Sequence, residues 1–212
     1  MDFTAARARL VEQLSTEIKD KRVLAAMSRI PRELFVPPES RHSAYEDRPL
    51  PIGWDQTISQ AFIIALMTEA LELIGSEKVL EVGTGSGYQA AILAELSRQV
   101  VTVERLPALA ENAKHVLDSL GYKNIEIHLV EETLGWKSGA PYDAIMVTAG
   151  APNVPNDLLA QLDIGGRMII PVGSRYVQEL CKITKRKGKN MVKNICGCRF
   201  VSLIGKGAWG EK

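Results

Sequence analysis

A glycine-rich turn between an apolar segment and an amphipathic segment is the feature that most constrains the fold of this chain. Residues 78–82 are predicted to form a short buried strand, and Gly83, Gly85 and Gly87 follow at every second position. Glycine permits a tight turn and lets a ligand approach the backbone closely. A helix is predicted directly after the turn, over residues 88–96. This order of strand, glycine turn and helix predicts the nucleotide-binding unit of an α/β fold.

The alternation of apolar runs and helical stretches continues along the chain. Strands are predicted over residues 100–104, 125–130, 144–148 and 167–172, and helices over residues 108–120 and 158–162. Such alternation indicates β-α-β units. Residues 179–185 and 190–203 instead predict paired strands around a Lys187-Gly188-Lys189 turn. The predicted fold class is therefore α/β, a Rossmann-like, doubly wound and mostly parallel sheet with C-terminal antiparallel strands.

An N-terminal helical extension is predicted before this sheet. The apolar spacing indicates two helices within residues 4–30, and Asp20 is placed to cap the second. Residues 31–57 are rich in proline and lack periodicity, which predicts a long ordered loop or a lid. Ser59 is predicted to cap a further helix over residues 60–74.

Length and composition restrict the class of protein. The 212 residues suffice for a single domain, with a helical, loop-rich front end over residues 1–75 and a cofactor-binding sheet over residues 76–212. A net charge of +1 and an aromatic content of 6% give no sign of a nucleic-acid partner. The basic run over residues 185–189 could be a nucleic-acid patch, but the near-neutral net charge favours a solvated hairpin tip.

The cellular location and the metal content follow from the ends and the cysteines. The N-terminus lacks the apolar core of a signal peptide, and no uncharged apolar run reaches the ~18 residues that span a bilayer. We therefore expect a cytoplasmic protein that binds no membrane. Cys181, Cys196 and Cys198 do not have the spacing of a metal or redox pair, so no metal ion is expected. A monomer is expected.

The residues around the glycine turn indicate which ligand it holds. Glu104 ends the next strand, about 20 residues after Gly83, where an acid can accept both hydroxyls of a ribose. A dinucleotide site needs G-x-G-x-x-G, but Tyr88 stands where the third glycine should be. Glu81 would repel a pyrophosphate and suits the ammonium group of S-adenosylmethionine. The pattern favours a methyltransferase over a dehydrogenase, and a tight turn that binds no ligand is the remaining interpretation.

Several further stretches together resemble one family of methyltransferases, the protein-L-isoaspartate O-methyltransferases. They are Leu34-Phe35-Val36-Pro37, the segment of residues 44–53, Gln56-Thr57-Ile58-Ser59-Gln60, Pro141-Tyr142-Asp143-Ala144-Ile145 and Pro171-Val172-Gly173. The glycine turn alone indicates only a class I methyltransferase. The T-I-S-Q stretch with the preceding L-P-I-G is what singles out this family. The similarity runs from about residue 6 to residue 209.

The resemblance implies an activity and a set of site residues. The family transfers a methyl group from S-adenosylmethionine to the free carboxylate of L-isoaspartyl residues in damaged proteins and peptides, which leaves S-adenosylhomocysteine. The methyl ester then cyclises to a succinimide, and repair begins. The serine matching Ser59 contacts the accepting carboxylate and is the expected catalytic residue. The expected cofactor-binding residues are Gln56, Thr57, Ile58, Glu81, Gly83, Thr84, Gly85, Gly87, Glu104, Arg105 and Glu131.

The chain departs from the family pattern at three places. Val130-Glu131-Glu132 replaces the usual G-D-G, so Glu131 is expected to meet the adenine amine with a longer side chain. Asp55 replaces a glycine and Ala61 a proline. Asp55 either adds negative charge beside an anionic acceptor or points to solvent. These departures keep two alternatives open, a class I methyltransferase for another carboxylate or small molecule, and a cofactor-binding module with weakened catalysis.

Overall fold

The computed structural model describes residues 2–210, which form a seven-stranded sheet, a separate two-stranded sheet and surrounding helices. The order across the large sheet is β5-β4-β3-β6-β7-β8-β9. Neighbouring strands from β5 to β7 are parallel, whereas β7–β8 and β8–β9 are antiparallel. The predicted fold class, a mostly parallel α/β sheet closed by antiparallel strands, is confirmed.

The elements have the following bounds. The strands of the large sheet are β3 (Lys78–Val82), β4 (Gln99–Glu104), β5 (Ile125–Leu129), β6 (Tyr142–Val147), β7 (Leu162–Gly173), β8 (Gln178–Thr184) and β9 (Met191–Cys198). The small sheet contains β1 (Leu50–Gly53) and β2 (Gln56–Ile58). The α-helices are α1 (Phe3–Leu14), α2 (Lys21–Arg29), α3 (Ala61–Ala70), α4 (Tyr88–Leu96), α5 (Pro107–Ser119) and α6 (Asn156–Gln161). Short 3-10 turns are η1 (Arg32–Phe35), η2 (Pro38–Ser43) and η3 (Lys137–Gly139).

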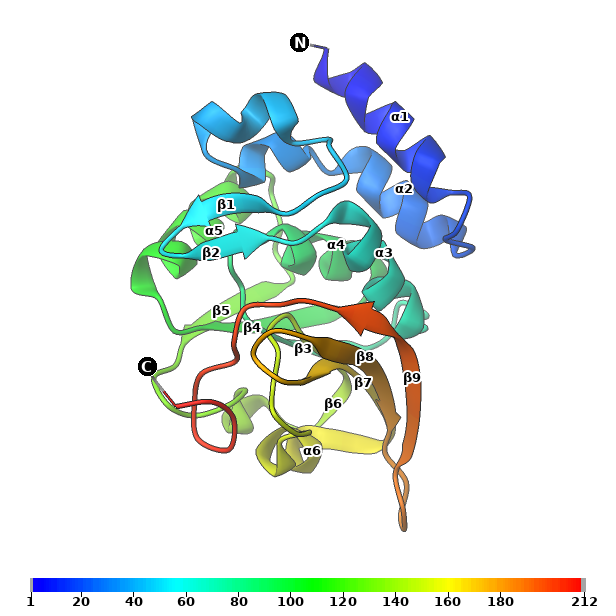
Figure 1. Ribbon diagram of the computed structural model, residues 1–212, viewed down its shortest axis with the longest axis vertical. Coiled ribbons are helices and arrows are strands. Elements are labelled where there is room, and N and C mark those ends of the chain that lie inside the picture. The colour runs from blue at the N-terminus through cyan, green and yellow to red at the C-terminus, as the bar shows by residue number, and fades with distance from the viewer. Residues whose placement is uncertain (1, 211–212) are drawn as a thin grey trace.

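Both faces of the large sheet are covered, which explains why its strands are continuous apolar runs. Val79 on β3 packs in a cluster with residues of α3 and α4, while Leu80 packs on the opposite face with Leu158 of α6. Figure 1 shows α3 and α4 on one side of the sheet and α6 on the other. Because side chains alternate along a strand, Glu81 lies on the same face as Val79.

The front end of the chain confirms two predicted helices and corrects the predicted loop. Asp20 caps α2 by accepting a hydrogen bond from the backbone N–H of Arg22. The prediction of an aperiodic loop over residues 31–57 was wrong, because η1, η2 and the antiparallel hairpin β1–β2 lie there. The strands of this hairpin have only four and three residues, and a proline such as Pro51 argues against a strand in the sequence. Runs this short carry too little periodicity to be identified from the sequence.

The helix that follows the hairpin begins and ends differently from the prediction. Gln60, not Ser59, precedes the first helical residue of α3, and the helix ends at Ala70. The cap comes from a residue far along the chain, since Asp47 Oδ1 accepts a hydrogen bond of 2.8 Å from the backbone N–H of Phe62. The predicted N-cap role of Ser59 was therefore wrong, and its hydroxyl is not used to start the helix.

The C-terminal part was predicted correctly only as far as Cys198. Strands β8 and β9 pair antiparallel around the turn that was expected at residues 187–189. Residues 199–203 do not continue the strand. Ser202 makes an isolated bridge with Gly150 instead, and this path carries the chain across the end of the sheet.

The front end shares a core with the sheet. One buried cluster contains Leu10 and Leu14 of α1, Met27 of α2, Ile64 of α3 and Ile92 of α4. The division at residue 75 stays a prediction, and the shared core favours one cooperative domain. Among residues 2–210, no helix is both long and apolar enough to cross a membrane.

Candidate active site

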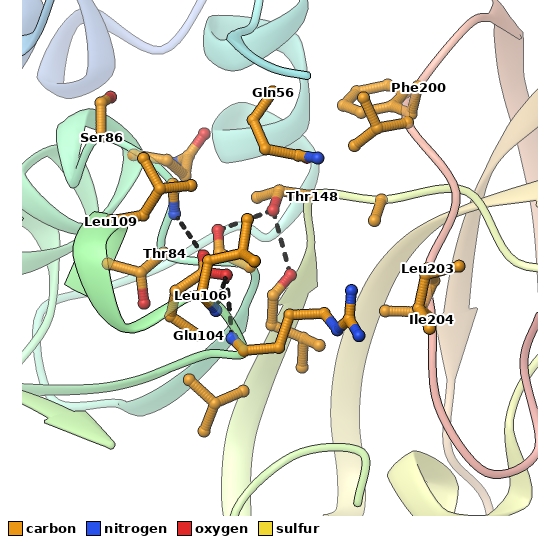
Figure 2. A pocket seen from close by; sticks show the side chains of 18 of the residues that line it. Gln56, Thr84, Ser86, Glu104, Leu106, Leu109, Thr148, Phe200, Leu203 and Ile204 are labelled. Atoms are coloured by element: carbon orange, nitrogen blue, oxygen red, sulfur yellow. Dashed lines mark hydrogen bonds between the residues drawn. The ribbon is translucent and has the colours of Figure 1, made fainter. Parts of the chain in front are cut away.

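A cavity lies at the carboxyl ends of the parallel strands, beside the point where the strand order reverses between β3 and β6. It contains about 1070 Å³ of atom-free space, its open mouth included. Ligands of doubly wound sheets bind at this place. Its wall is formed by the segment of residues 56–59, the glycine turn, the ends of β4, β5 and β6, and residues 200–204. Figure 2 shows side chains from these separate segments converging on one space.

The glycine turn is held against the end of β6. Gly83 has a φ of 101°, and a Cβ atom at this position would overlap Thr148 Oγ1. The Thr148 hydroxyl in turn donates to the carbonyl oxygens of Val82 and Gly83, at 3.0 and 2.8 Å. Gly87 has a φ of 88° and leads directly into α4. Only glycine combines this conformation with this close packing, so the backbone of the turn stays open to the cavity.

Glu104 presents a fixed carboxylate at the cavity wall. Its Oε2 accepts a hydrogen bond of 2.9 Å from the backbone N–H of Gly85. Its Oε1 accepts from the N–H groups of Arg105 and Leu106, at 2.8 and 3.0 Å. Figure 2 shows Glu104 between these segments. A carboxylate oxygen accepts more than one hydrogen bond, so the group is oriented while keeping acceptor capacity for a ligand.

The structure does not bring Glu81 to the cavity wall. Its side chain is fully buried behind the glycine turn, and burial raises its pKa to about 8. Thr102 Oγ1 donates to Glu81 Oε2 at 2.6 Å, and the hydroxyls of Thr84 and Thr102 are 2.7 Å apart. Glu81 Oε1 has no hydrogen-bond partner among the described residues. Glu81 therefore reaches the cavity only through Thr102 and Thr84, and its predicted contact with the cofactor stays a prediction.

The segment of residues 56–59 forms the opposite wall. Gln56, Thr57, Ile58 and Ser59 all line the cavity. The first three form strand β2 and Ser59 follows it directly. The hairpin β1–β2 lies over the glycine turn, since Ile52 Cδ1 is 3.6 Å from where a Cβ of Gly85 would be. The predicted acceptor residue and the predicted cofactor turn therefore face the same space.

A second cavity adjoins the first at Ser59. It contains about 730 Å³ of atom-free space and shares with the first cavity Thr57, Ser59, Thr148, Phe200 and Val201. The rest of its lining is Pro49, Gln60, Ile63, Gly197, Cys198 and Arg199. Arg199 is exposed and makes no described ion pair. Ser59 thus lies between a glycine-lined cavity and a cavity with a free cationic side chain.

The three departures from the family pattern, at Glu131, Asp55 and Ala61, differ in where they lie relative to the cavities. Glu131 lines the first cavity, as do Thr133 and Leu134. Asp55 has a φ of 57° at the tip of the hairpin, is exposed, and is absent from the lining of both cavities. Of the two readings of Asp55, the structure favours the side chain that points to solvent. Ala61 is buried in the first turn of α3.

Some lining residues were not predicted from the sequence. Thr148 follows the apolar strand β6 directly, and that position is a usable signal because the carboxyl ends of parallel strands meet at one edge. Residues 200–204 carry no such signal. They reach the cavity through isolated bridges and through backbone bonds such as Leu203 N–H to the carbonyl of Gly150, at 2.8 Å. Among residues 2–210 no group of three or more His, Cys, Asp or Glu is arranged to hold a metal ion.

Comparisons with known proteins agree with the site. A family model described as protein-L-isoaspartate(D-aspartate) O-methyltransferase matches residues 5–208. The chain is 53% identical over 215 residues to the protein-L-isoaspartate O-methyltransferase of Geobacter metallireducens, with 100% of both chains covered. It is also 53% identical to that of Syntrophus aciditrophicus, with 98% of this chain and 97% of the relative covered.

Solved structures show the same similarity in three dimensions. One protein-L-isoaspartate O-methyltransferase superposes with a TM-score of 0.85 at 31% identity, covering 95% of this chain and 67% of the other. A Plasmodium falciparum beta-aspartate methyltransferase in complex with S-adenosyl-L-homocysteine superposes with a TM-score of 0.80 at 26% identity, covering 93% and 97%. The resemblance seen in the motifs is confirmed over nearly the whole chain, and the chain belongs to the protein-L-isoaspartate(D-aspartate) O-methyltransferase family.

Proposed function

We propose that this chain transfers the methyl group of S-adenosylmethionine to the free carboxylate of L-isoaspartyl residues in proteins and peptides. The observation that carries the proposal is the junction of two cavities at Ser59, in a chain that matches protein-L-isoaspartate O-methyltransferases over its full length. One cavity has the features of a nucleotide site. The other opens on the far side of Ser59, where an acceptor can enter.

The first cavity fits the cofactor at several points. The carboxylate of Glu104 is oriented by three backbone N–H groups and can accept bonds from two ribose hydroxyls. Gly83, Thr84 and Gly85 line the cavity and expose backbone to a ligand without phosphate, while Gly87 supports the turn by starting α4. S-adenosylmethionine, when bound, supplies a methyl group already activated by its sulfonium. Together with Arg105, Glu131 and residues 56–58, these are the residues we assign to it.

The acceptor side requires orientation rather than proton transfer. A carboxylic acid with a reference pKa of ~3.9 is already ionised at neutral pH, so no general base is needed. The hydroxyl of Ser59 can donate a hydrogen bond to one carboxylate oxygen and leave the other free to react. The exposed guanidinium of Arg199 has the sign that attracts an anionic group into the second cavity. The rate then depends mainly on how well donor and acceptor are aligned.

The apolar part of the wall limits access of water. Phe200 and Val201, in the segment that follows β9, line both cavities. Ile58, Leu203 and Ile204 line the first cavity. Figure 2 shows Phe200, Leu203 and Ile204 along one side of the space. These side chains favour a bound acceptor over water near the reacting atoms.

The remaining parts of the proposal concern partners and surroundings. We infer that the enzyme needs no metal ion, because the donor is activated by its own positive charge and the acceptor is already ionised. We also infer a monomer in the cytoplasm that acts on proteins and peptides and has no nucleic-acid or membrane partner. The near-neutral charge and low aromatic content support the absence of a nucleic-acid partner.

Methyl transfer to matched peptides tests the proposal. The protein is incubated with labelled S-adenosylmethionine and with two peptides that differ only in carrying isoaspartate or aspartate at one position. We expect base-labile label on the isoaspartyl peptide alone. Equal labelling of both peptides would indicate a methyltransferase for another carboxylate. Binding of the cofactor by calorimetry without any transfer would indicate a binding module instead.

A further inference from the structure

We infer that the buried Arg32 is a positioning residue that holds the acceptor wall of the site against the donor wall. The inference rests on the proposed function and concerns a residue that lines neither cavity. Arg32 belongs to the 3-10 turn η1 and is 0% exposed. It contacts three parts of the chain that are distant in sequence, and two of them form the site.

The first link runs to the acceptor wall. Arg32 Nη2 donates a hydrogen bond of 2.7 Å to the carbonyl oxygen of Ser59, and its Nε donates one of 2.9 Å to the carbonyl oxygen of Ala44. On the other side of Ser59, Asp47 accepts bonds from Phe62 N–H at 2.8 Å and from Gln60 Nε2 at 3.0 Å. The backbone of Ser59 is therefore fixed from both directions.

The second link runs to the donor wall. The guanidinium carbon of Arg32 lies 4.9 Å from the ring centroid of Tyr88, a cation–π contact. Tyr88 is the first residue of α4, directly after Gly87 of the glycine turn, and it lines the cofactor cavity. Phe35, from the same 3-10 turn as Arg32, meets the Tyr88 ring edge-on with centroids 5.3 Å apart. Arg32 thus connects Ser59 directly to the element that carries the glycine turn.

Arg32 is an energetically expensive way to fill this space. Its Nη1 has no hydrogen-bond partner, and no described ion pair includes the residue. Burial lowers the pKa of Arg32, opposed by Tyr88 and Asp47 nearby, yet a guanidinium stays charged at neutral pH. An apolar side chain would avoid the cost of desolvating a charge. An apolar side chain could not, however, donate hydrogen bonds to two carbonyl oxygens while stacking on an aromatic ring, as the rigid, planar guanidinium does.

The contribution expected of this arrangement is alignment. Methyl transfer requires the acceptor oxygen, the methyl carbon and the sulfur to lie in line, and a displacement of about 1 Å costs on the order of 100-fold in rate. Releasing Ser59 from the donor wall should therefore lower kcat. Binding of the cofactor depends mainly on Glu104 and the glycine turn, so it should change little.

The experiment compares Arg32→Met with Arg7→Met. Arg7 is the matched control because it also lies mostly buried in the front end, donates to the Tyr45 hydroxyl at 2.9 Å, pairs with Glu33 at 3.5 Å and makes no described hydrogen bond or ion pair with a residue of either cavity. For each variant we would measure kcat and KM with the isoaspartyl peptide, the Kd of S-adenosylhomocysteine by calorimetry, and Tm. We expect Arg32→Met to lower kcat about 10- to 100-fold with Kd changed less than about threefold. Arg7→Met should lower Tm while kcat stays within about threefold of wild type.

The opposite pattern would overturn the inference. That pattern is a kcat for Arg32→Met within about threefold of wild type, or losses of kcat in both variants that follow their losses of Tm. If Arg32→Met does not fold, Arg32→Lys is compared with Arg7→Lys under the same criteria. A wild-type protein that fails to methylate the isoaspartyl peptide contradicts the proposed function instead, so the two failures are distinguishable.

Discussion

Ser59 lines both cavities, and its hydroxyl is not consumed in capping α3. We expect Ser59→Ala to lower kcat about 10- to 100-fold, because a hydrogen bond to a charged group is worth about 1.5–3 kcal/mol. The Kd of S-adenosylmethionine should stay within about threefold. Steady-state kinetics and calorimetry measure the two effects, and Ser119→Ala, at an exposed position of α5, is the control. Equal losses of kcat and of cofactor affinity would make Ser59 a cofactor residue only.

The buried carboxyl of Glu81 makes the free energy of unfolding depend on pH in a direction that can be predicted. Burial raises its pKa from 4.5 to about 8 in the folded protein. Between these values the folded state binds more protons than the unfolded state, so the free energy of unfolding falls as pH rises through this range. Each unit of pKa difference corresponds to about 1.4 kcal/mol, so the effect is a few kcal/mol.

The variant Glu81→Gln cannot titrate and tests this sign. Relative to wild type, its free energy of unfolding should increase as pH rises from 5 to 8, as measured by urea unfolding at several pH values. Glu12→Gln on the exposed face of α1 is the control for losing one acid. A constant difference between Glu81→Gln and wild type at every pH would mean that the buried carboxyl does not carry a raised pKa.

At the scale of elements, Gly83 of the glycine turn can be compared with Gly75, which lies before β3 and outside the turn. Gly83 and Gly75 have φ angles of 101° and 103°, but only at Gly83 would a Cβ overlap a neighbour, Thr148 Oγ1. Both substitutions to alanine carry the backbone cost of a left-handed conformation, about 1–2 kcal/mol. Gly83→Ala should therefore be the more destabilising in urea unfolding and should also weaken cofactor binding. Equal destabilisation would show that the turn tolerates displacement of Thr148.

The elements differ in how far the sequence determined them. The strand and helix on either side of the glycine turn, β3 and α4, were predicted with their observed bounds. A buried strand and a largely apolar helix on either side of a glycine turn carry a strong pattern, and residues 88–94 of α4 are all buried. The hairpin β1–β2 was missed because its strands are too short to show a pattern. The start of α3 was misplaced because its cap, Asp47, comes from tertiary structure that no local rule contains.

The candidate site shows the same division. Glu104, Gly83 and Gly85 were located by their spacing, and the structure brings them into one cavity with Gln56, Thr57, Ile58, Ser59, Arg105 and Glu131. Gly87 is absent from the lining and packs against Ala113 and Leu117 of α5. Glu81 was expected beside the ligand, yet the alternation of side chains along β3 turns it away from the wall. Residues 200–204 form a wall only because the chain crosses the sheet after β9. The spacing of residues in the sequence identifies site residues within one β-α-β unit. The wall of residues 200–204 depends instead on the path of the whole chain, which spacing does not show.

For the whole molecule, the shared core predicts one unfolding transition. Leu10 and Met27 of the front end pack in the same cluster as Ile92 of α4, so neither part buries its apolar surface alone. Calorimetry should give a single peak whose calorimetric and van't Hoff enthalpies agree, shifted to higher temperature by S-adenosylhomocysteine. Two separate transitions, with only one shifted by the ligand, would show that residues 1–75 fold as an independent unit.

The central claim is that the two cavities bring donor and acceptor together at Ser59. The most direct measurement is a crystal structure of the complex with S-adenosylhomocysteine and an isoaspartyl peptide. The account predicts the ribose hydroxyls on Glu104, and the peptide carboxylate in the second cavity at about 3 Å from the Ser59 hydroxyl, a hydrogen-bond distance. A peptide bound elsewhere, or a carboxylate that leaves Ser59 facing solvent, would contradict it.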